Sequence, residues 1–261
     1  MFNQRLSYAF SSVKHMSADI ISNDVVTNFI SQSEAVQSER LWKATRSIIN
    51  ESSLIVADQV VDGCFTFLNQ SYRLDTSCPS RWALDPYDDK LWQYYLHYQD
   101  YLVDLLKAYA FNGNKVYANR IVELISDWIC CNPFWVKDAW EPYTIAKRLD
   151  NWSQVVPHLT SEGMLSHGFI QELMGSVTRQ AQFLMENLEY DIGNNHLITD
   201  AKALAVTGTV FSLLPFSSRW RDKGYNLLWA EMERQVHSEG SHCEHSMSYH
   251  MVVLKDYLEA I

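Results

Sequence analysis

The sequence is poor in the residues that break or cross-link a chain. It has only 9 glycines and 6 prolines among 261 residues, which argues against collagen-like and low-complexity scaffolds. The five cysteines are odd in number, two of them are adjacent, and none forms a paired CxxC pattern. Neither a disulfide framework nor a structural zinc module is therefore expected, and the usage indicates a reducing compartment or a tolerance of free thiols.

Basic charge and long apolar runs are also scarce. The chain has 21 Lys and Arg against 31 Asp and Glu, a net charge of −10, so its field repels nucleic acid and anionic membranes. No window approaches about 18 uninterrupted apolar residues, and the N-terminus lacks the basic start and apolar run of a secretory signal. We therefore expect a soluble, cytoplasmic protein with no membrane insertion and no nucleic-acid partner.

Residues 1–90 are the least regular part, and we expect an N-terminal leader that packs on a larger body. Helical spacing is present over 33–50, and the aromatic-rich stretch 64–74 predicts a short hairpin.

From Leu91 onward, helical periodicity and short breaks predict a series of helices. The expected ranges are 91–111, 114–131, 141–158, 162–187, 194–214, 217–236 and 244 to the end. Alternate helices begin 50, 53 and 50 residues apart, a period typical of stacked helical hairpins. We expect an all-α fold in which residues 91–261 form an array or closed ring of antiparallel helix pairs. The last helix has no stop signal, so we expect the chain to end inside a larger architecture.

Three segments place unusual polar residues at predicted helix starts. Arg148 is embedded among apolar positions and needs an anionic partner, either a core carboxylate such as Asp150 or Glu141, or a ligand. The pair Asn195 and His196 follows Gly193-Asn194 at the start of a helix. Asparagine there is explained by helix capping alone, but helix N-terminal amides with an imidazole also favour a bound carboxylate.

The third segment, 235–250, contains four His, one Cys and two Glu. Zinc is one interpretation of this composition, but the spacing of the histidines matches no compact metal motif, and we predict no metal site in this chain. The alternative is an acid/base site at Tyr249, whose phenol can give and take a proton if nearby charge lowers its pKa.

Four stretches in this order carry a family resemblance. They are LWQYYLHYQDYL (91–102), WEPYTIAKRLDNW (140–152), NNHLITDAKALAVTGTVF (194–211) and EMERQVHSEGSHCEHSMSYH (231–250). Together they resemble the helical domain of heparinase II/III-type polysaccharide lyases, including alginate-lyase relatives. The resemblance implies an incomplete (α/α) toroid followed by a C-terminal β-sandwich. That second domain, with a further His and often a structural metal, is absent from these residues, so no cofactor is expected in this chain.

The resemblance also implies a chemistry, β-elimination on an acidic, uronate-containing polysaccharide. Asn195 and His196 then face the uronate carboxylate, and Tyr249 transfers the proton. Arg148, Tyr143 and His242 become further substrate-binding candidates. The sequence departs from the family pattern in Glu239-Gly240, where Asp-Gly is common, and in His245, where a smaller or apolar residue is usual. The family also offers the periplasm as an alternative compartment.

Other interpretations stay open. The aromatic residues of 91–111 are typical of a helix-packing core, with Trp92 and His97 the best candidates for sugar contact. A non-catalytic glycan-binding helical domain is a second functional hypothesis. A glycoside hydrolase using carboxylates such as Asp85, Glu141 or Glu244 is a third. The oligomeric state is not indicated by the sequence.

Overall fold

The computed structural model describes residues 21–35, 51–74, 81–134 and 137–260. The helices of these segments are α2 (Asn23–Ala35), α4 (Glu51–Val61), α5 (Lys90–Tyr98), α6 (Tyr101–Asn112), α7 (Lys115–Cys131), α8 (Pro142–Ser161), α9 (His167–Glu186), α10 (Asn194–Val210), α11 (Ser217–Gln235) and α12 (Met247–Ala260), with short 3-10 helices η2 (Arg81–Ala83) and η3 (Lys137–Trp140). The two strands are β1 (Cys64–Phe67) and β2 (Gln70–Arg73).

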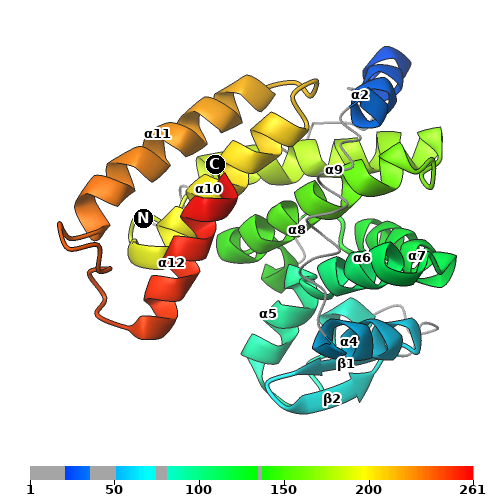
Figure 1. Ribbon diagram of the computed structural model, residues 1–261, viewed down its shortest axis with the longest axis horizontal. Coiled ribbons are helices and arrows are strands. Elements are labelled where there is room, and N and C mark those ends of the chain that lie inside the picture. Colours follow the sequence, from blue (N-terminus) through cyan, green and yellow to red (C-terminus); the bar gives the residue numbers. More distant parts are fainter. Residues whose placement is uncertain (1–20, 36–50, 75–80, 135–136, 261) are drawn as a thin grey trace.

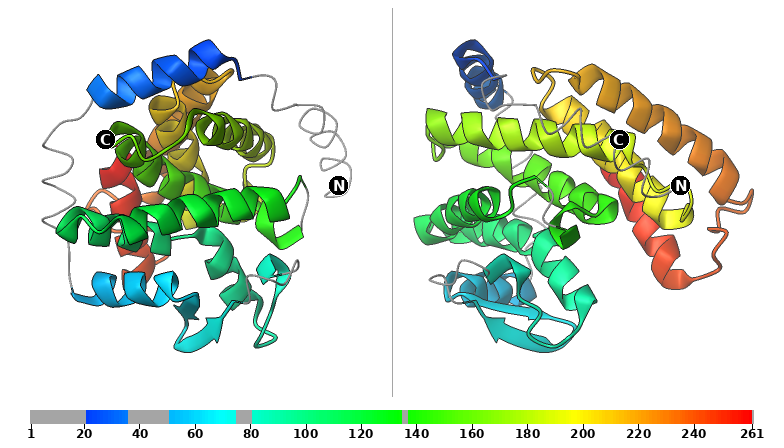
Figure 2. Two further views of the ribbon diagram at one scale, coloured as in Figure 1. Left: turned by 90° about the vertical axis from the view of Figure 1, so that its right-hand side faces the viewer. Right: turned by 180° about the vertical axis from the view of Figure 1, so that it is seen from behind.

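Successive long helices pack as antiparallel pairs. Short turns join α6 to α7, α8 to α9 and α10 to α11, and the members of each pair are in contact (Figure 1). Helix α8 contacts α5, α6, α9 and α10, and so lies at the centre of the arrangement. Figure 2 shows the same stacking of layers from two further sides. The expected all-α fold, an incomplete (α/α) toroid of helical hairpins, is confirmed.

The predicted helix 91–111 is wrong in one respect, because it is two helices. Gln99 adopts a left-handed conformation, with φ of 61°, and separates α5 from α6. The break leaves the last carbonyl groups of α5 without partners in their own helix. Two side chains of α8 fill this role: Arg148 donates to the His97 carbonyl at 3.1 Å, and Asn151 donates to the Tyr98 carbonyl at 2.9 Å.

The predicted hairpin at 64–74 is confirmed. β1 and β2 pair antiparallel, with Phe65 opposite Tyr72 and Phe67 opposite Gln70. Phe65 is buried, and its ring meets that of Tyr101 edge-on at 4.9 Å. Helices α2 and α4 also contribute buried residues to the same apolar core as α5–α11. The helical spacing over 33–50 lies mostly outside the described residues, and the predicted division of the chain at residue 90 remains a prediction.

The helix starts follow their local sequence. Asn114 and Ser166 cap α7 and α9 by accepting backbone N–H groups, from Val116 at 3.1 Å and from Phe169 at 3.2 Å. Pro142 occupies the first turn of α8, where its missing N–H costs nothing. None of the helices in the described ranges is both long and apolar enough to cross a membrane.

Candidate active site

The turn before α10 has an unusual backbone. Gly193 and Asn194 both have positive φ, 68° and 48°, a conformation that ordinary residues adopt only when their surroundings hold them there. Two contacts hold this turn: Gln235 donates to the Asn194 carbonyl at 3.1 Å, and the Asn194 amide donates to Glu244 at 3.3 Å. The N-cap residue of α10 is Gly193 rather than an asparagine, and the Asn194 side chain instead contacts the loop that follows α11. The turn sets the direction of the next two side chains.

Asn195 and His196 are the first of these side chains. Asn195 is buried, 6% exposed, and among the described residues no hydrogen bond from its side-chain amide is found. His196 is half-buried, and its Nδ1 atom lies 3.2 Å from an Oε2 oxygen of Glu189. Within the described part of the chain, its Nε2 atom has no hydrogen-bond partner. The start of α10 thus presents an amide and an imidazole beside the positive end of a helix dipole.

Tyr143 covers one face of the His196 ring. The two ring centroids are 4.3 Å apart, and the planes are tilted by 34°. On its other side, Tyr143 meets the ring of Tyr98 edge-on at 5.8 Å. Burial raises the pKa of the Tyr143 phenol, so this hydroxyl is a neutral hydrogen-bond donor at physiological pH. Of the predicted substrate-binding residues, Tyr143 is the one placed directly beside His196.

Tyr249 lies on the first turn of α12 and is 45% exposed. Its backbone N–H lies 3.5 Å from the Ser246 hydroxyl oxygen. Within the described segments, no hydrogen bond or ring contact joins Tyr249 to Asn195 or His196. Two of the three predicted catalytic residues therefore lie at consecutive positions in the first turn of α10, and the third lies on the exposed start of α12. That the three meet at one substrate remains a prediction.

His242 is buried among other protein groups, and its contact with substrate stays a prediction. Its Nε2 atom lies 2.9 Å from Gln235 Oε1, and its Nδ1 accepts the Glu244 N–H at 3.4 Å. Burial lowers the pKa of His242, so its ring is neutral and Nε2–H is the donor to Gln235. Because Gln235 in turn donates to the Asn194 carbonyl, His242 helps to position the start of α10 through Gln235.

Arg148 is fully buried, and among the residues that the structure describes it has no anionic partner, contrary to the prediction. Its three nitrogens donate to uncharged oxygens: the Gln180 side chain at 2.8 Å, and the His97 and Ala139 carbonyls at 3.1 and 2.9 Å. The guanidinium also stacks 3.8 Å from the centroid of the Trp128 ring. Arg148 therefore binds the negative end of α5 and has no surface left for a ligand.

Trp92 and His97 are also buried, in line with the packing interpretation, and their contact with a sugar stays a prediction. Trp92 donates to the Gln70 carbonyl at 3.0 Å and packs against the hairpin. The Nδ1 atom of His97 accepts the Trp128 indole N–H at 3.1 Å. Burial, followed by the charge of Arg148, lowers the pKa of His97 to about 3, so this imidazole is neutral. The packing interpretation of 91–111 holds for both residues.

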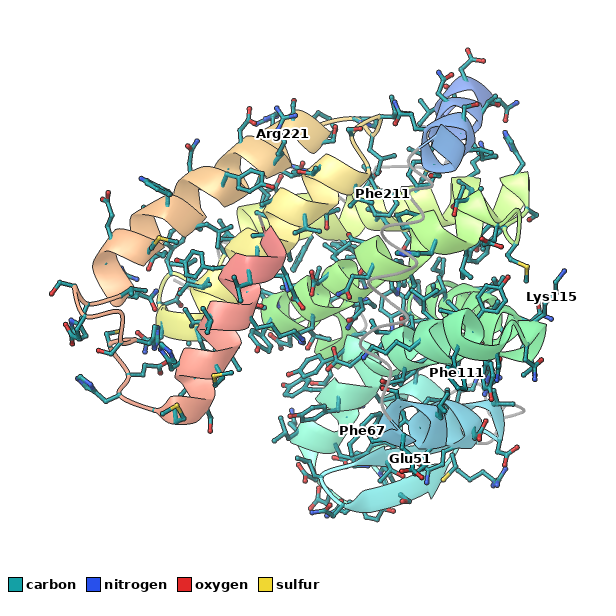
Figure 3. All side chains as sticks on the ribbon, viewed as in Figure 1. Glu51, Phe67, Phe111, Lys115, Phe211 and Arg221 are labelled. Atoms are coloured by element: carbon teal, nitrogen blue, oxygen red, sulfur yellow. The ribbon has the colours of Figure 1, made fainter. Side chains whose placement is uncertain are left out.

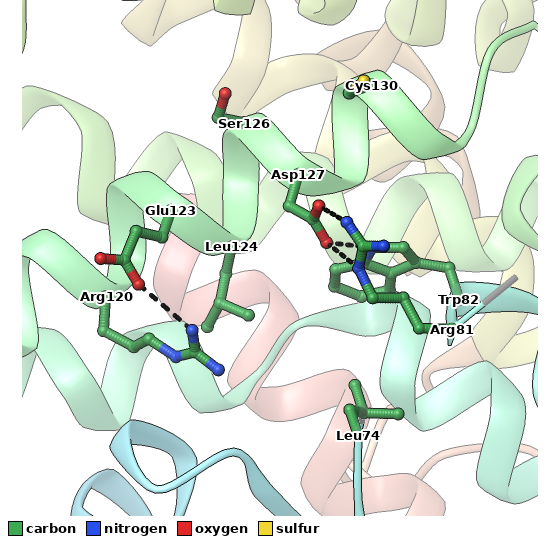
Figure 4. Close-up of a pocket in the computed structure, with 9 residues that line it drawn as sticks. All are labelled: Leu74, Arg81, Trp82, Arg120, Glu123, Leu124, Ser126, Asp127 and Cys130. Atoms are coloured by element: carbon green, nitrogen blue, oxygen red, sulfur yellow. Dashed lines mark hydrogen bonds and ion pairs between the residues drawn. The ribbon is translucent and has the colours of Figure 1, made fainter. Parts of the chain in front are cut away.

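A cavity of about 420 Å³ lies apart from these residues, between α7, η2 and the residue after β2 (Figure 4). Its charges are paired within it: Arg81 with Asp127, and Arg120 with Glu123 at 3.2 Å. None of the predicted site residues lines this cavity. Among the described residues, no group of three or more His, Cys, Asp or Glu side chains is arranged to hold a metal ion.

Two residues of the site were not singled out from the sequence. Glu189 lies seven positions before His196, and Gln235 lies forty positions after Asn195. Glu189 is in the loop between α9 and α10, where an acidic residue is ordinary, and Gln235 ends a helix. No spacing rule connects either of them to α10, so only the folded structure reveals their contacts.

The fold is an incomplete helical toroid with an amide and an imidazole at the start of α10. Similarity to known proteins identifies the family. The family described as Heparinase II/III N-terminus matches residues 9–261, so the chain belongs to it. Heparin-sulfate lyases of Bacteroides thetaiotaomicron and Pedobacter heparinus are 27% and 26% identical over 185 and 184 residues. Each alignment covers 69% of this chain, but only 26% and 28% of the relative.

Solved structures share the fold. The crystal structure of heparan sulfate lyase HepC from Pedobacter heparinus superposes with a TM-score of 0.75 at 22% identity, covering 90% of this chain and 39% of that one. A crystal structure of heparinase III gives a TM-score of 0.72 at 26% identity, covering 81% of this chain and 34% of the other. The chain thus covers 39% and 34% of these two solved structures, and less than a third of the two heparin-sulfate lyases named above. Its fold corresponds to part of a larger protein.

Proposed function

We propose that this chain is the helical part of a polysaccharide lyase that cleaves an acidic, uronate-containing glycan by β-elimination. The observation that carries the proposal is that an amide side chain, Asn195, and a half-buried imidazole, His196, both lie in the first turn of α10. Membership of the heparinase II/III family supports it, and the heparin-sulfate lyases among the relatives favour a sulfated glycosaminoglycan as the substrate class.

The first step is removal of the proton on C5 of the uronate. This proton becomes acidic when the adjoining carboxylate is neutralised, because the electron pair left on C5 spreads into that group as an enolate. The Asn195 amide would donate a hydrogen bond to a carboxylate oxygen, and so would Nε2–H of His196 once that ring has taken a second proton from solvent. Charge that grows on the carboxylate in the transition state is then stabilised by these donors.

The second step breaks the bond between C4 and the glycosidic oxygen. Tyr249, entering the step as the phenolate, would accept the C5 proton, and the C5 electron pair then forms the C4–C5 double bond while the C4–O bond breaks. The departing oxygen takes a proton, which the same phenol can return when both lie on one side of the sugar. No water is consumed, and the product is an unsaturated uronate. The 45% exposure of Tyr249 leaves its hydroxyl accessible to a polymer.

The test is an assay of the complete polypeptide that contains this chain. We expect it to produce ultraviolet absorbance from unsaturated uronate with at least one of heparan sulfate, hyaluronan, alginate and bacterial capsular polysaccharides. Tyr249→Phe should lower kcat by about 100-fold or more while glycan binding persists. Absence of product from every acidic glycan, with a known lyase active in the same assay, would falsify the proposal.

Two other outcomes identify the alternatives. Binding without turnover, in the original protein as well as in Tyr249→Phe, would indicate a glycan-binding domain. Products with saturated ends would indicate a hydrolase. Of the three carboxylates considered for hydrolysis, Asp85 accepts the Asp89 N–H at 2.7 Å and Glu244 accepts the Asn194 amide at 3.3 Å, so both are engaged in local structure.

A further inference from the structure

Hydrogen bonds from the backbone of Glu189 to other residues fix its position. Its N–H donates to an Asp200 carboxyl oxygen at 3.1 Å, and its carbonyl accepts the Gly193 N–H at 2.8 Å. Both partners are buried; Asp200 lies in the second turn of α10, and Gly193 is the N-cap residue of the same helix. Glu189 is therefore fixed relative to α10 although it lies in a loop, and its side chain is directed at His196 by residues of the same helix.

Glu189 is the carboxylate that lies beside His196, and a second acid, Asp200, is buried nearby. Asp200 is fully buried, and burial, followed by the charge of Glu189, holds the pKa of Asp200 well above its usual range. The Glu189 side chain is 13% exposed, so water screens its carboxylate only weakly from the His196 Nδ1 atom 3.2 Å away.

The contacts with Glu189 and Tyr143 restrict the neutral His196 ring to one tautomer and one orientation. An ionised carboxylate only accepts hydrogen bonds, so Nδ1 must carry a proton. The Tyr143 ring, 4.3 Å from the imidazole centroid, opposes rotation of the ring out of this position. The Nε2 atom then points away from Glu189, and it can donate to an anion once the ring is doubly protonated.

We propose that Glu189 is a positioning residue that fixes the proton of His196 on Nδ1 and stabilises the doubly protonated ring when the uronate carboxylate binds at Nε2. The inference deepens the proposed function and, for its catalytic part, rests on it. A contrast within the molecule supports it. His97, the fully buried histidine, has Arg148 rather than a carboxylate beside it, and its Nδ1 accepts a hydrogen bond instead of donating one.

The test replaces Glu189 by Gln, which removes the charge but keeps the shape and both backbone hydrogen bonds of this position. Asp191→Asn is the matched control, because Asp191 is an exposed carboxylate of the same loop and makes no described contact with His196. In the original protein, nitrogen NMR of labelled histidine should show the neutral His196 ring with its proton on Nδ1. In Glu189→Gln we expect a large Nε2–H population, and in Asp191→Asn no change.

Activity provides the second measurement. We expect Glu189→Gln to lower kcat by about 10- to 100-fold with KM changed by less than about threefold, because the interaction strengthens as charge grows on the substrate. Asp191→Asn should keep both constants. Thermal unfolding of each variant checks that the fold is intact, and Glu189→Asp, which retains the charge, should recover part of kcat.

The outcomes separate the two proposals. An unchanged His196 tautomer in Glu189→Gln overturns the positioning role, whatever the activity. A changed tautomer with unchanged kcat in an active protein overturns its catalytic part. If the original protein is inactive on every glycan, the proposed function fails, while the NMR result still decides whether Glu189 fixes the imidazole proton.

Discussion

Helix α10 contacts α11 and α12 by different means, and the contrast shows two ways of holding a helix. Towards α11 the contact is a close approach of backbones. A Cβ atom added at Gly224 would lie 2.4 Å from the Ala205 nitrogen, and one added at Gly208 would lie 2.4 Å from the Ser217 carbonyl oxygen. Neither glycine has a positive φ, so here the small residue is required by space rather than by backbone conformation.

Towards α12 the contact is made by charges. Lys202 of α10 is 2% exposed, and it bonds to Asp150 of α8 at 2.9 Å and to Asp256 of α12 at 3.2 Å, with Glu259 as a third carboxylate partner. Thr199 adds a hydrogen bond to Asp256 at 2.7 Å. The α11 contact depends on shape, which pH does not alter, whereas the α12 contact depends on the ionisation of Lys202 and its partners.

The largest effect is expected from breaking the α11 contact. Gly224→Ala should destabilise the fold by about 3 kcal/mol or more, because the new methyl group meets backbone atoms of α10 that cannot rotate away. Urea unfolding measures the free energy. Gly168→Ala is the matched control: it is also helical, nothing lies within 4 Å of its added Cβ, and it should be neutral or slightly stabilising. Similar stabilities for the two variants would contradict the close-approach argument.

The next effect is expected from breaking the α12 contact. Lys202→Met leaves Asp150 and Asp256 buried without their cation and should cost about 2 to 3 kcal/mol, a value discounted because Glu259 is 35% exposed. Lys255→Met provides the control, since Lys255 also pairs with Glu259, at 3.6 Å, but on the surface. We expect that variant to change the unfolding free energy by less than about 0.5 kcal/mol. Equal losses in both variants would show that the buried cluster has no special weight.

The smallest expected effect is the pH dependence of the free energy of unfolding, which tests whether the α12 contact depends on ionisation. Burial alone would lower the pKa of Lys202, but attraction to its three carboxylates outweighs it, and the net shift is upward from 10.5. The folded state therefore binds this proton more tightly than the unfolded chain. Its stabilisation is complete below pH 10.5 and is lost as the pH rises through the raised pKa.

Unfolding free energies at several pH values between about 8 and 11.5 should fall more steeply for the original protein than for Lys202→Met. Burial also raises the pKa of Tyr98 and Tyr101, so both proteins lose some stability in alkali. The difference between the two curves isolates Lys202. Parallel curves would mean that the proton on Lys202 does not hold α12.

Much of the helical organisation follows from sequence pattern, and the errors have identifiable physical causes. The break between α5 and α6 was missed because the left-handed residue is Gln99, where glycine or asparagine would have been the usual signal. The same break explains the error at Arg148. Its acceptors are carbonyl groups freed at the end of α5, and these exist only because the helix stops there.

The site was predicted unevenly for a related reason. Asn195 and His196 are adjacent in sequence, so their proximity follows from any helix at that position. The contacts with Glu189 and Tyr143 cross between elements, and periodicity carries no information about them. For the remaining predicted site residues, the sequence does not reveal burial. Trp92, His97 and His242 have polar atoms that suit a ligand, yet in the folded chain these atoms bond to other protein groups.

Helix α12 lies beside α10 (Figure 3), and its side-chain contacts with other helices are concentrated near its C-terminal end. The charge cluster holds Asp256 and Glu259, whereas five of the first six residues, Met247–Val252, are exposed. Tyr249 lies seven residues from Asp256, about 10 Å along the helix axis at 1.5 Å per residue. The position of the Tyr249 phenol is therefore set, through the length of the helix, by residues in its last five positions, Asp256, Tyr257 and Glu259, which contact α10 and α11.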